Sequence, residues 1–189
     1  MSDPSSTLNL SPATSALLVI DFQERLFTAM PEHRRELAAR ATGNLAFAAR
    51  SLDVPVLLTE QYPKGLGSTI GSVADELGGV SAVEKTEFSV CLVEAAGPQL
   101  DQLAGRTVIV AGMETHVCVF QTVRDLVARG FSVHVAHDAV LSRTEDNRRI
   151  GLDLCREAGA TISGSETVVF DWLKQAGGDV FKAYSRRIR

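Results

Sequence analysis

Residues 107–118 read TVIVAGMETHVC and join a short apolar run to the start of a helix. The run TVIVA is the clearest strand in the chain, because it is short, apolar and rich in β-branched residues. It ends at Gly112. The segment 116–129 then carries apolar residues at helical spacing and is stopped by Gly130. A strand followed directly by a helix predicts one unit of an α/β fold.

The same alternation continues on both sides of this unit. Apolar runs predict further strands at 16–21, 55–60, 80–84, 131–136 and 160–163, and helical spacing predicts helices at 32–52, 93–103, 145–158 and 166–175. Six strands alternating with helices predict a parallel sheet covered on both faces. No repeat or low-complexity linker divides the chain, so residues 16–189 are predicted to form one domain. Residues 1–15 are expected to be a flexible N-terminal arm or a packing extension.

The bulk composition excludes several classes of protein. The chain has 189 residues and a formal net charge of -4, which argues against a dedicated nucleic-acid or membrane-surface binder. No segment approaches the roughly 20 apolar residues of a membrane span, and no secretory signal is present. Three widely spaced cysteines fit free thiols in a reducing compartment. We therefore expect a cytoplasmic protein whose basic C-terminal residues, Arg186, Arg187 and Arg189, form a solvated tail.

Functional side chains of a parallel α/β sheet gather where the strands end. This rule selects Asp21, Glu60 with the loop after it, Lys85 and the segment 112–118. Asp21 ends an apolar strand, where an unpaired carboxylate is costly, so it either accepts a proton or caps a neighbouring loop. Lys85 is either part of a surface ion pair or a cation that stabilises Asp21 and a developing negative charge.

Cys118 is the candidate nucleophile. If Thr115 is the N-cap, Cys118 is the third helical residue and lies beside unpaired backbone N–H groups at the positive end of the helix dipole. That environment lowers the pKa of a cysteine and gives a reactive thiolate. The alternative is a small, buried apolar cysteine, which is common for this residue type.

These residues lie in segments that resemble the isochorismatase-like cysteine hydrolases, a family that includes nicotinamidases and N-carbamoylsarcosine amidase. The matching segments are LLVIDFQERLF (17–27), LLTEQYPKGLG (57–67), EKTEFSV (84–90), VAGMETHVCVFQT (110–122) and HDAVLSR (137–143). The resemblance implies a three-layer α/β/α, Rossmann-like fold around a six-stranded parallel sheet. It maps the family's catalytic triad onto Asp21, Lys85 and Cys118.

The resemblance also implies a non-proline cis peptide bond, which here would join Met113 to Glu114. In the family this bond lies four residues before the nucleophile. It would direct the N–H group of Glu114, together with that of Cys118, toward the oxyanion of the substrate.

One part of the nicotinamidase pattern is missing. Those enzymes carry a metal-binding Asp-x-His near the end of the second strand, whereas this chain reads TEQYP at 59–63. We therefore expect neither a metal nor an organic cofactor, and we do not expect nicotinamidase activity. True isochorismatases cleave a vinyl ether by acid catalysis without a cysteine nucleophile, so Cys118 favours acyl chemistry. The motifs are most similar to a branch related to the isochorismatase-domain proteins.

Residues in or beside these motifs are candidate walls of a substrate pocket, namely Phe22, Gln61, Tyr62, Phe88 and Thr115. The aromatic ones could equally belong to the core, which is the more frequent place for them.

We do not expect His116, His134 or Asp138 to take part in catalysis. His116 lies two residues before Cys118, and residues at that spacing on a helix do not face each other. A Cys–His dyad is therefore not favoured. We expect His116 to line the pocket or to lie in a contact between subunits. His134 is expected to be packed inside, and Asp138 is expected to order its loop.

The sequence therefore predicts a hydrolase of a small amide, carbamoyl or related acyl substrate that acts through a cysteine thioester. The alternatives are ether or ester hydrolysis at the same site, and a non-catalytic binding or assembly protein. The family resemblance implies a homo-oligomer, and neither nucleic acid nor a membrane is an expected partner.

Overall fold

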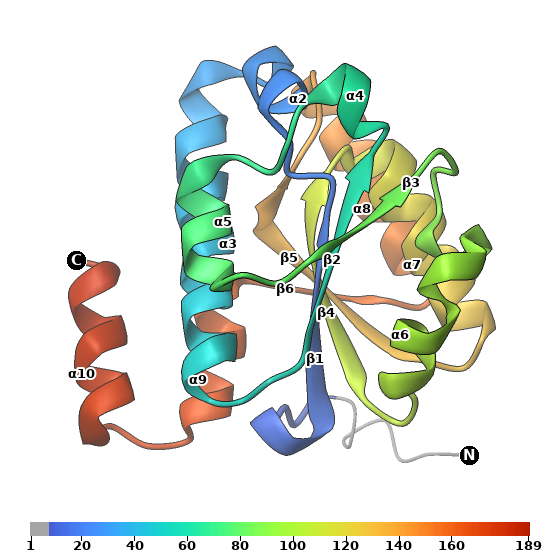
Figure 1. Ribbon diagram of the computed structural model, residues 1–189. Coiled ribbons are helices and arrows are strands. Elements are labelled where there is room, and N and C mark those ends of the chain that lie inside the picture. The colour runs from blue at the N-terminus through green and yellow to red at the C-terminus, as the bar shows by residue number, and fades with distance from the viewer. Residues whose placement is uncertain (1–7) are drawn as a thin grey trace.

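The computed structural model describes residues 8–189, which form one sheet of six parallel strands in the order β3-β2-β1-β4-β5-β6. The predicted α/β fold is therefore confirmed (Figure 1). The strands are β1 (Ser15–Ile20), β2 (Val56–Gln61), β3 (Ala82–Lys85), β4 (Thr107–Met113), β5 (Ser132–Leu141) and β6 (Thr161–Ser163).

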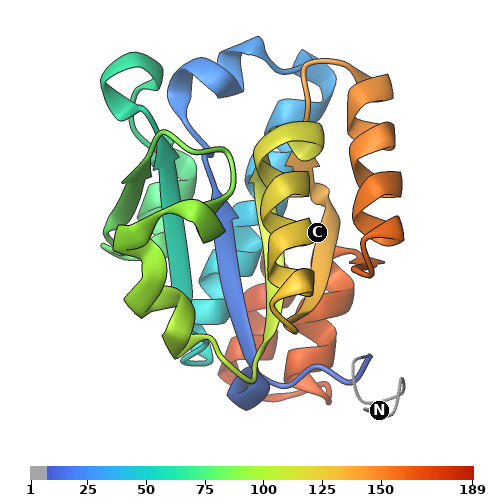
Figure 2. The ribbon, with the colours of Figure 1, turned by 90° about the vertical axis from the view of Figure 1, so that its right-hand side faces the viewer.

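Helices cover both faces of the sheet and give three layers (Figures 1 and 2). One face carries α3 (Glu32–Ser51), α5 (Gly71–Leu77) and α9 (Ser165–Leu173), with α10 (Gly178–Arg187) packed outside α3. The other face carries α6 (Gly97–Gln102), α7 (Phe120–Ala128) and α8 (Glu145–Glu157). Two short helices, α2 (Glu24–Ala29) and α4 (Pro63–Leu66), lie above the carboxyl ends of the strands.

Strand β1 divides the interior into two hydrophobic cores. All six of its residues are completely buried. Leu17 and Val19 point into the core beneath α3, whereas Leu18 and Ile20 point into the core beneath α7. Because both faces are covered, the strand is apolar from Ala16 to Ile20 rather than alternating, as expected for a central parallel strand.

The strand order reverses between β1 and β4. The chain runs outward from β1 through β2 to β3, and in the opposite direction from β4 through β5 to β6. The loops after β1 and β4 therefore diverge, and a crevice at such a point is the usual ligand site of an open α/β sheet. Asp21 follows β1, and Cys118 lies in the turn after β4.

The described part of the N-terminal segment agrees with one of the two expectations for it. Residues 1–7 of the predicted arm lie outside the described residues. In the part that is described, Leu10 is buried in the core beneath α3 and its N–H donates to Asp171. This part is a packing extension that includes the 3₁₀ turn η1 (Pro12–Thr14), and β1 already begins at Ser15.

The solvated-tail interpretation is wrong for Arg187. Residues 178–187 form α10, which the sequence analysis missed, and its final turn contacts α3. The Arg187 guanidinium pairs with Glu76 at 2.5 Å and lies 4.5 Å from the centre of the Phe47 ring. Tyr184 of this helix is completely buried and packs against Phe170 of α9, so tertiary contacts hold this short helix in place.

Two other boundaries move, and three short helices were not predicted. The helix expected at 93–103 is shortened to α6, because Pro98 favours a helix start; the 3₁₀ turns η2 (Val90–Leu92) and η3 (Glu94–Ala96) precede it. Strand β5 extends to Leu141, five residues beyond the prediction for 131–136. Helices α2, α4 and α5 were not predicted.

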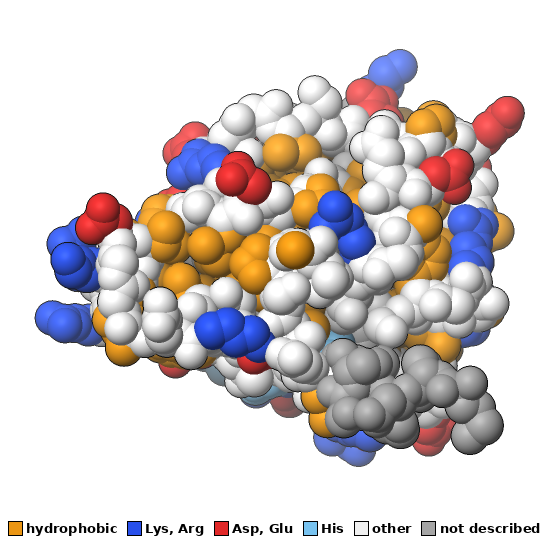
Figure 3. Space-filling model, turned by 90° about the horizontal axis from the view of Figure 1, so that it is seen from below, with side chains coloured by type: hydrophobic (Ala, Val, Ile, Leu, Met, Phe, Trp, Pro, Cys, Tyr) orange, Lys and Arg blue, Asp and Glu red, His pale blue; other side chains and the backbone are white. Residues whose placement is uncertain are grey.

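The edge at which the strands begin is shown in Figure 3. Hydrophobic side chains gather in one area of this face, with scattered charged side chains around it.

None of the helices in residues 8–189 has the length and apolar character that crossing a lipid bilayer requires.

Candidate active site

Asp21 and Lys85 form a buried ion pair at the carboxyl edge of the sheet. Lys85 Nζ donates to Asp21 Oδ2 at 2.6 Å, and both side chains are 0% exposed. Breaking such a pair from one side leaves an unpaired charge in the interior, which is strongly destabilising. The surface ion-pair alternative for Lys85 is therefore wrong.

The backbone directs Asp21 into this position. Its φ of 51° lies in the left-handed region, which Asp tolerates better than most residues. The turn begins directly after the last residue of β1, and the Asp21 N–H donates to Thr59 on β2. The Thr59 hydroxyl donates to Asp21 Oδ1 at 2.7 Å. Each carboxylate oxygen therefore has a donor.

Lys85 has several acceptors besides Asp21. Its ammonium donates to Gln61 Oε1 at 2.7 Å and to the backbone carbonyls of Glu87 and Phe88 at 3.2 and 3.3 Å. An ammonium has three protons, so these four acceptors occupy it fully, with the two carbonyls sharing the last proton. Lys85 is thereby held as a fixed positive charge beside Asp21.

Cys118 lies in a π-helical turn, η4 (Thr115–Val119), and α7 begins only at Phe120. The expected N-cap role of Thr115 is wrong: Glu114 occupies that place, and the Thr115 hydroxyl donates to the carbonyl of Leu141 on β5. The turn therefore presents Cys118 before the regular helix starts. π-helical turns are frequent at functional sites.

The expected low pKa of Cys118 is also wrong. The thiol is 6% exposed, and this burial is the main cause that raises its pKa to about 12. The charge of Asp21 and a hydrogen bond to that carboxylate raise it further, while Lys85 acts in the opposite direction. Desolvation and the neighbouring carboxylate therefore dominate the electrostatics of this thiol. At neutral pH the site holds a thiol rather than a thiolate.

The peptide bond between Met113 and Glu114 is cis, at the place that the family resemblance implies. The Glu114 carboxylate turns away from the backbone and pairs with Arg143 at 3.0 Å; the Arg143 N–H donates to the same oxygen. The side chain of Glu114 therefore joins the loop after β5 to the turn that carries Cys118.

Gly112 explains how β4 can approach β1 so closely before this turn. Its φ is +140°, and a Cβ at that position would lie 2.1 Å from the carbonyl oxygen of Ile20. Only glycine fits such a position without moving the backbone. The register of Ile20 against Gly112 thus brings Asp21 and the Cys118 turn to the same edge.

The five candidate pocket residues separate into different environments. Phe22 is completely buried in the core beneath α3 and contacts Phe27, so it is a core residue. Thr115 is buried and structural. Tyr62 and Phe88 are 55% and 51% exposed on the loops beside Lys85. Gln61 is directed at the ammonium rather than at solvent.

The remaining polar residues behave as structural groups. His116 Nδ1 lies 3.0 Å from Ser142 Oγ, which ties the turn to the loop after β5. His134 is 3% exposed, as a packed histidine would be. Asp138 accepts hydrogen bonds from both the N–H and the hydroxyl of Ser165, the first residue of α9.

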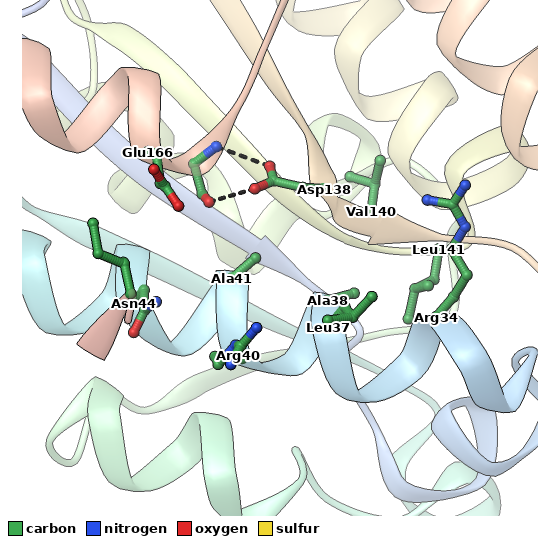
Figure 4. Close-up of a pocket in the computed structure, with 12 residues that line it drawn as sticks. Arg34, Leu37, Ala38, Arg40, Ala41, Asn44, Asp138, Val140, Leu141 and Glu166 are labelled. Atoms are coloured by element: carbon green, nitrogen blue, oxygen red, sulfur yellow. Dashed lines mark hydrogen bonds between the residues drawn. The ribbon is translucent and has the colours of Figure 1, made fainter. Parts of the chain in front are cut away.

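Two cavities lie near these elements. One, of about 300 Å³, is lined by Lys85 and by residues of the two loops beside it, including Tyr62 and Glu87. The other, of about 240 Å³, lies between α3 and β5 and is lined by Arg40, Asp138 and Glu166 among others (Figure 4). Cys118 does not line either cavity, and Figure 4 shows that Asp138 is already engaged with its neighbour.

Within residues 8–189, no group of three or more His, Cys, Asp or Glu side chains is arranged to hold a metal ion. At the end of β2, Glu60 accepts hydrogen bonds from the N–H and hydroxyl of Thr69 at 2.7 Å. The Glu60 carboxylate is thus used to hold a loop.

Gly151 is a site residue that the sequence analysis missed. It lies in α8, and a Cβ there would be 2.7 Å from the backbone of Thr115 and His116. Close packing of α8 on the Cys118 turn therefore requires glycine. A glycine inside an amphipathic helix was the available signal, because such a residue usually has a packing reason.

We predict that Gly151→Ala will lower stability by about 1–3 kcal/mol, the usual cost of overpacking, and will slow alkylation of Cys118 by displacing its turn. Gly43→Ala is the matched control. Gly43 is also helical, but its added Cβ would lie 3.5 Å from the nearest atom, so this variant should be up to about 1 kcal/mol more stable. Thermal denaturation and mass spectrometry measure both effects; equal behaviour of the two variants would contradict the packing role.

Comparisons with known proteins agree with this geometry. Residues 15–167 match the family described as Isochorismatase domain. The chain is 36% identical over 181 residues to Isochorismatase domain-containing protein 1 of Danio rerio, covering 96% of this chain but only 63% of that protein. The structure of MAR1 ribonuclease from Caenorhabditis elegans is 35% identical, with a TM-score of 0.86 over 95% of this chain and 92% of that one. The Escherichia coli YcaC gene product, described as an octameric hydrolase of unknown specificity, shares the fold at 20% identity, with a TM-score of 0.82 over 95% of this chain and 94% of that one.

Proposed function

Because the chain belongs to the isochorismatase domain family, we propose that it is a hydrolase of small amide, carbamoyl or related acyl compounds. The observation that carries this proposal is the contact of a buried thiol with a carboxylate that is itself paired with a buried ammonium. A thiol, a base and a fixed cation are the groups that nucleophilic catalysis at a carbonyl needs.

In the proposed reaction, Asp21 accepts the thiol proton as Cys118 sulfur attacks the carbonyl carbon. The oxyanion accepts hydrogen bonds from the N–H groups of Glu114 and Cys118. Asp21 then gives the proton to the leaving amine, and the C–N bond breaks to leave a thioester. Water attacks the thioester, releases the carboxylic acid and restores the thiol. The raised pKa of Cys118 suits this scheme, because proton transfer occurs during the attack and no free thiolate is required.

Ester or vinyl-ether hydrolysis at the same site is the alternative chemistry, and a non-catalytic binding protein is the alternative outside enzymes. The ribonuclease in the name of the Caenorhabditis elegans relative is a further activity to test. We also propose that the chain forms a homo-oligomer in the cytoplasm; the octameric description of YcaC supports the first part.

We predict that iodoacetamide will label Cys118 faster than Cys91 or Cys155 at pH 7. Burial raises the pKa of all three thiols, but a carboxylate hydrogen bond is found at Cys118. The Cys118 rate should depend only weakly on pH, because the neighbouring carboxylate accepts the thiol proton, whereas a buried thiol without a base reacts about tenfold faster for each pH unit up to its pKa. Rates are measured for each peptide by mass spectrometry between pH 5 and 10. The assignment of Cys118 as the nucleophile would be contradicted if its labelling rate rose steadily by about tenfold for each pH unit, or if Cys91 were labelled faster.

The substrate class is tested with a panel of small amides, carbamoyl compounds, esters and an RNA oligonucleotide. Rapid acid quenching should trap an acyl adduct on the Cys118 peptide with the amides or carbamoyl compounds. Turnover of a substrate without any adduct, or turnover of RNA alone, would contradict the proposed chemistry.

A further inference from the structure

Gln61, the last residue of β2, lies opposite Lys85 in the parallel register of β2 and β3. Its side-chain amide has two partners at the same distance. Oε1 accepts from Lys85 Nζ at 2.7 Å, and Nε2 donates to the carbonyl of Thr86 at 2.7 Å. Rotating the amide by 180° would set an NH₂ group against the ammonium and an oxygen against a carbonyl. Both ends of the amide are thus fixed in a single orientation.

The backbone of Gln61 is held as firmly as its side chain. Gln23, which is completely buried, accepts from the Gln61 N–H at 2.7 Å and donates to the Gln61 carbonyl at 3.0 Å. The Gln23 amide also donates to the carbonyl of Gly67 at 2.7 Å. One buried side chain therefore fixes both polar backbone atoms of Gln61 and the loop beyond it.

We infer that Gln61, anchored by Gln23, is a positioning residue: its uncharged amide holds the Lys85 ammonium against Asp21 without adding a second negative charge. It supplies one of the two short hydrogen bonds to that ammonium, and Asp21 supplies the other. This inference rests on the proposed function and replaces the earlier role of Gln61 as a pocket wall.

The electrostatics explain why an amide is needed there rather than a carboxylate. Lys85 lowers the pKa of Cys118, while the surrounding carboxylates raise it. A glutamate at position 61 would compete with Asp21 for the ammonium and add another negative charge. It would also face the Thr86 carbonyl with an acceptor, because an ionised carboxylate cannot donate. The amide offers an acceptor to Lys85 without adding a negative charge and without placing an acceptor against the Thr86 carbonyl.

The test uses the full chain with Gln61→Met and Gln61→Glu. Gln61→Met keeps the volume but removes the acceptor, and Gln61→Glu keeps an acceptor but adds the charge. We expect both to slow iodoacetamide labelling of Cys118 at pH 7 by about 10- to 100-fold, the range for a hydrogen bond to a charged group. The rate profile should also move to higher pH, further in Gln61→Glu. On any substrate found, kcat should fall more than KM changes.

Glu60→Gln is the matched control. Glu60 precedes Gln61 on β2 and is equally hydrogen-bonded, but to Thr69. Its substitution should lower the melting temperature and leave the Cys118 profile unchanged. The inference is overturned if both Gln61 variants keep the wild-type Cys118 profile and kcat, with only a lower melting temperature. Failure of the proposed function can be distinguished from failure of this inference, because only in the first case would the Cys118→Ala variant retain turnover.

Discussion

Cys118→Ala will lose turnover by about 10⁴-fold or more, the order of magnitude found when the nucleophile of a catalytic triad is removed. No acyl adduct should form on the variant, because its sulfur is the atom that becomes acylated. The thiol is nearly buried and small, so the fold should survive with a modest change in melting temperature. Steady-state kinetics and mass spectrometry of the quenched reaction measure both effects.

Cys91→Ala is the matched control for this experiment. Cys91 is as buried as Cys118, with 6% exposure for each, and it lies in the same hydrophobic core. Its replacement should affect stability to a similar degree while leaving turnover within a fewfold of wild type. Comparable activity of the two variants would mean that hydrolysis does not pass through Cys118.

Asp21→Asn is expected to reduce kcat by about 10²–10⁴-fold, the usual contribution of a general acid–base group. Asparagine tolerates the left-handed backbone at this position as aspartate does. The amide cannot accept the thiol proton, and it leaves the Lys85 ammonium without its buried counter-ion. A large loss of stability, about 3–5 kcal/mol, should therefore accompany the loss of activity.

The double variant Asp21→Asn/Lys85→Met separates these two effects. It removes both charges, so part of the stability should return, since an apolar replacement of a buried ion pair is often tolerated. Activity should not return, because the base is still absent. Urea denaturation measures the stability, and steady-state kinetics on the same samples measure the activity. If the double variant regains activity with stability, the pair is a structural ion pair with no part in the chemistry.

The layered architecture could be predicted from sequence because burial on both faces leaves a local pattern. The apolar run of residues 16–20 in β1, and the step from TVIVA to Gly112 and a helix, each indicate strands of a covered parallel sheet. Helix α10 was missed although Val180, Tyr184 and Ile188 lie at helical spacing, because the segment is short and begins with two glycines. Its position comes from tertiary contacts: the completely buried Tyr184 packs edge-on against Phe170 of α9, and Arg187 contacts α3.

The sequence by itself determined which groups are candidates for chemistry: an acid, a lysine and a cysteine at strand ends that must meet on one edge of the sheet. It did not determine the protonation state of the cysteine. Residue type and position at a helix start predicted a low pKa for Cys118, whereas burial and the Asp21 carboxylate raise the pKa to about 12. Desolvation and charge proximity depend on distances between segments far apart in the chain, such as the 2.6 Å contact of Asp21 with Lys85. Only the tertiary structure sets these distances, and it therefore decided that the Lys85 ammonium lies between the Asp21 carboxylate and the Gln61 amide.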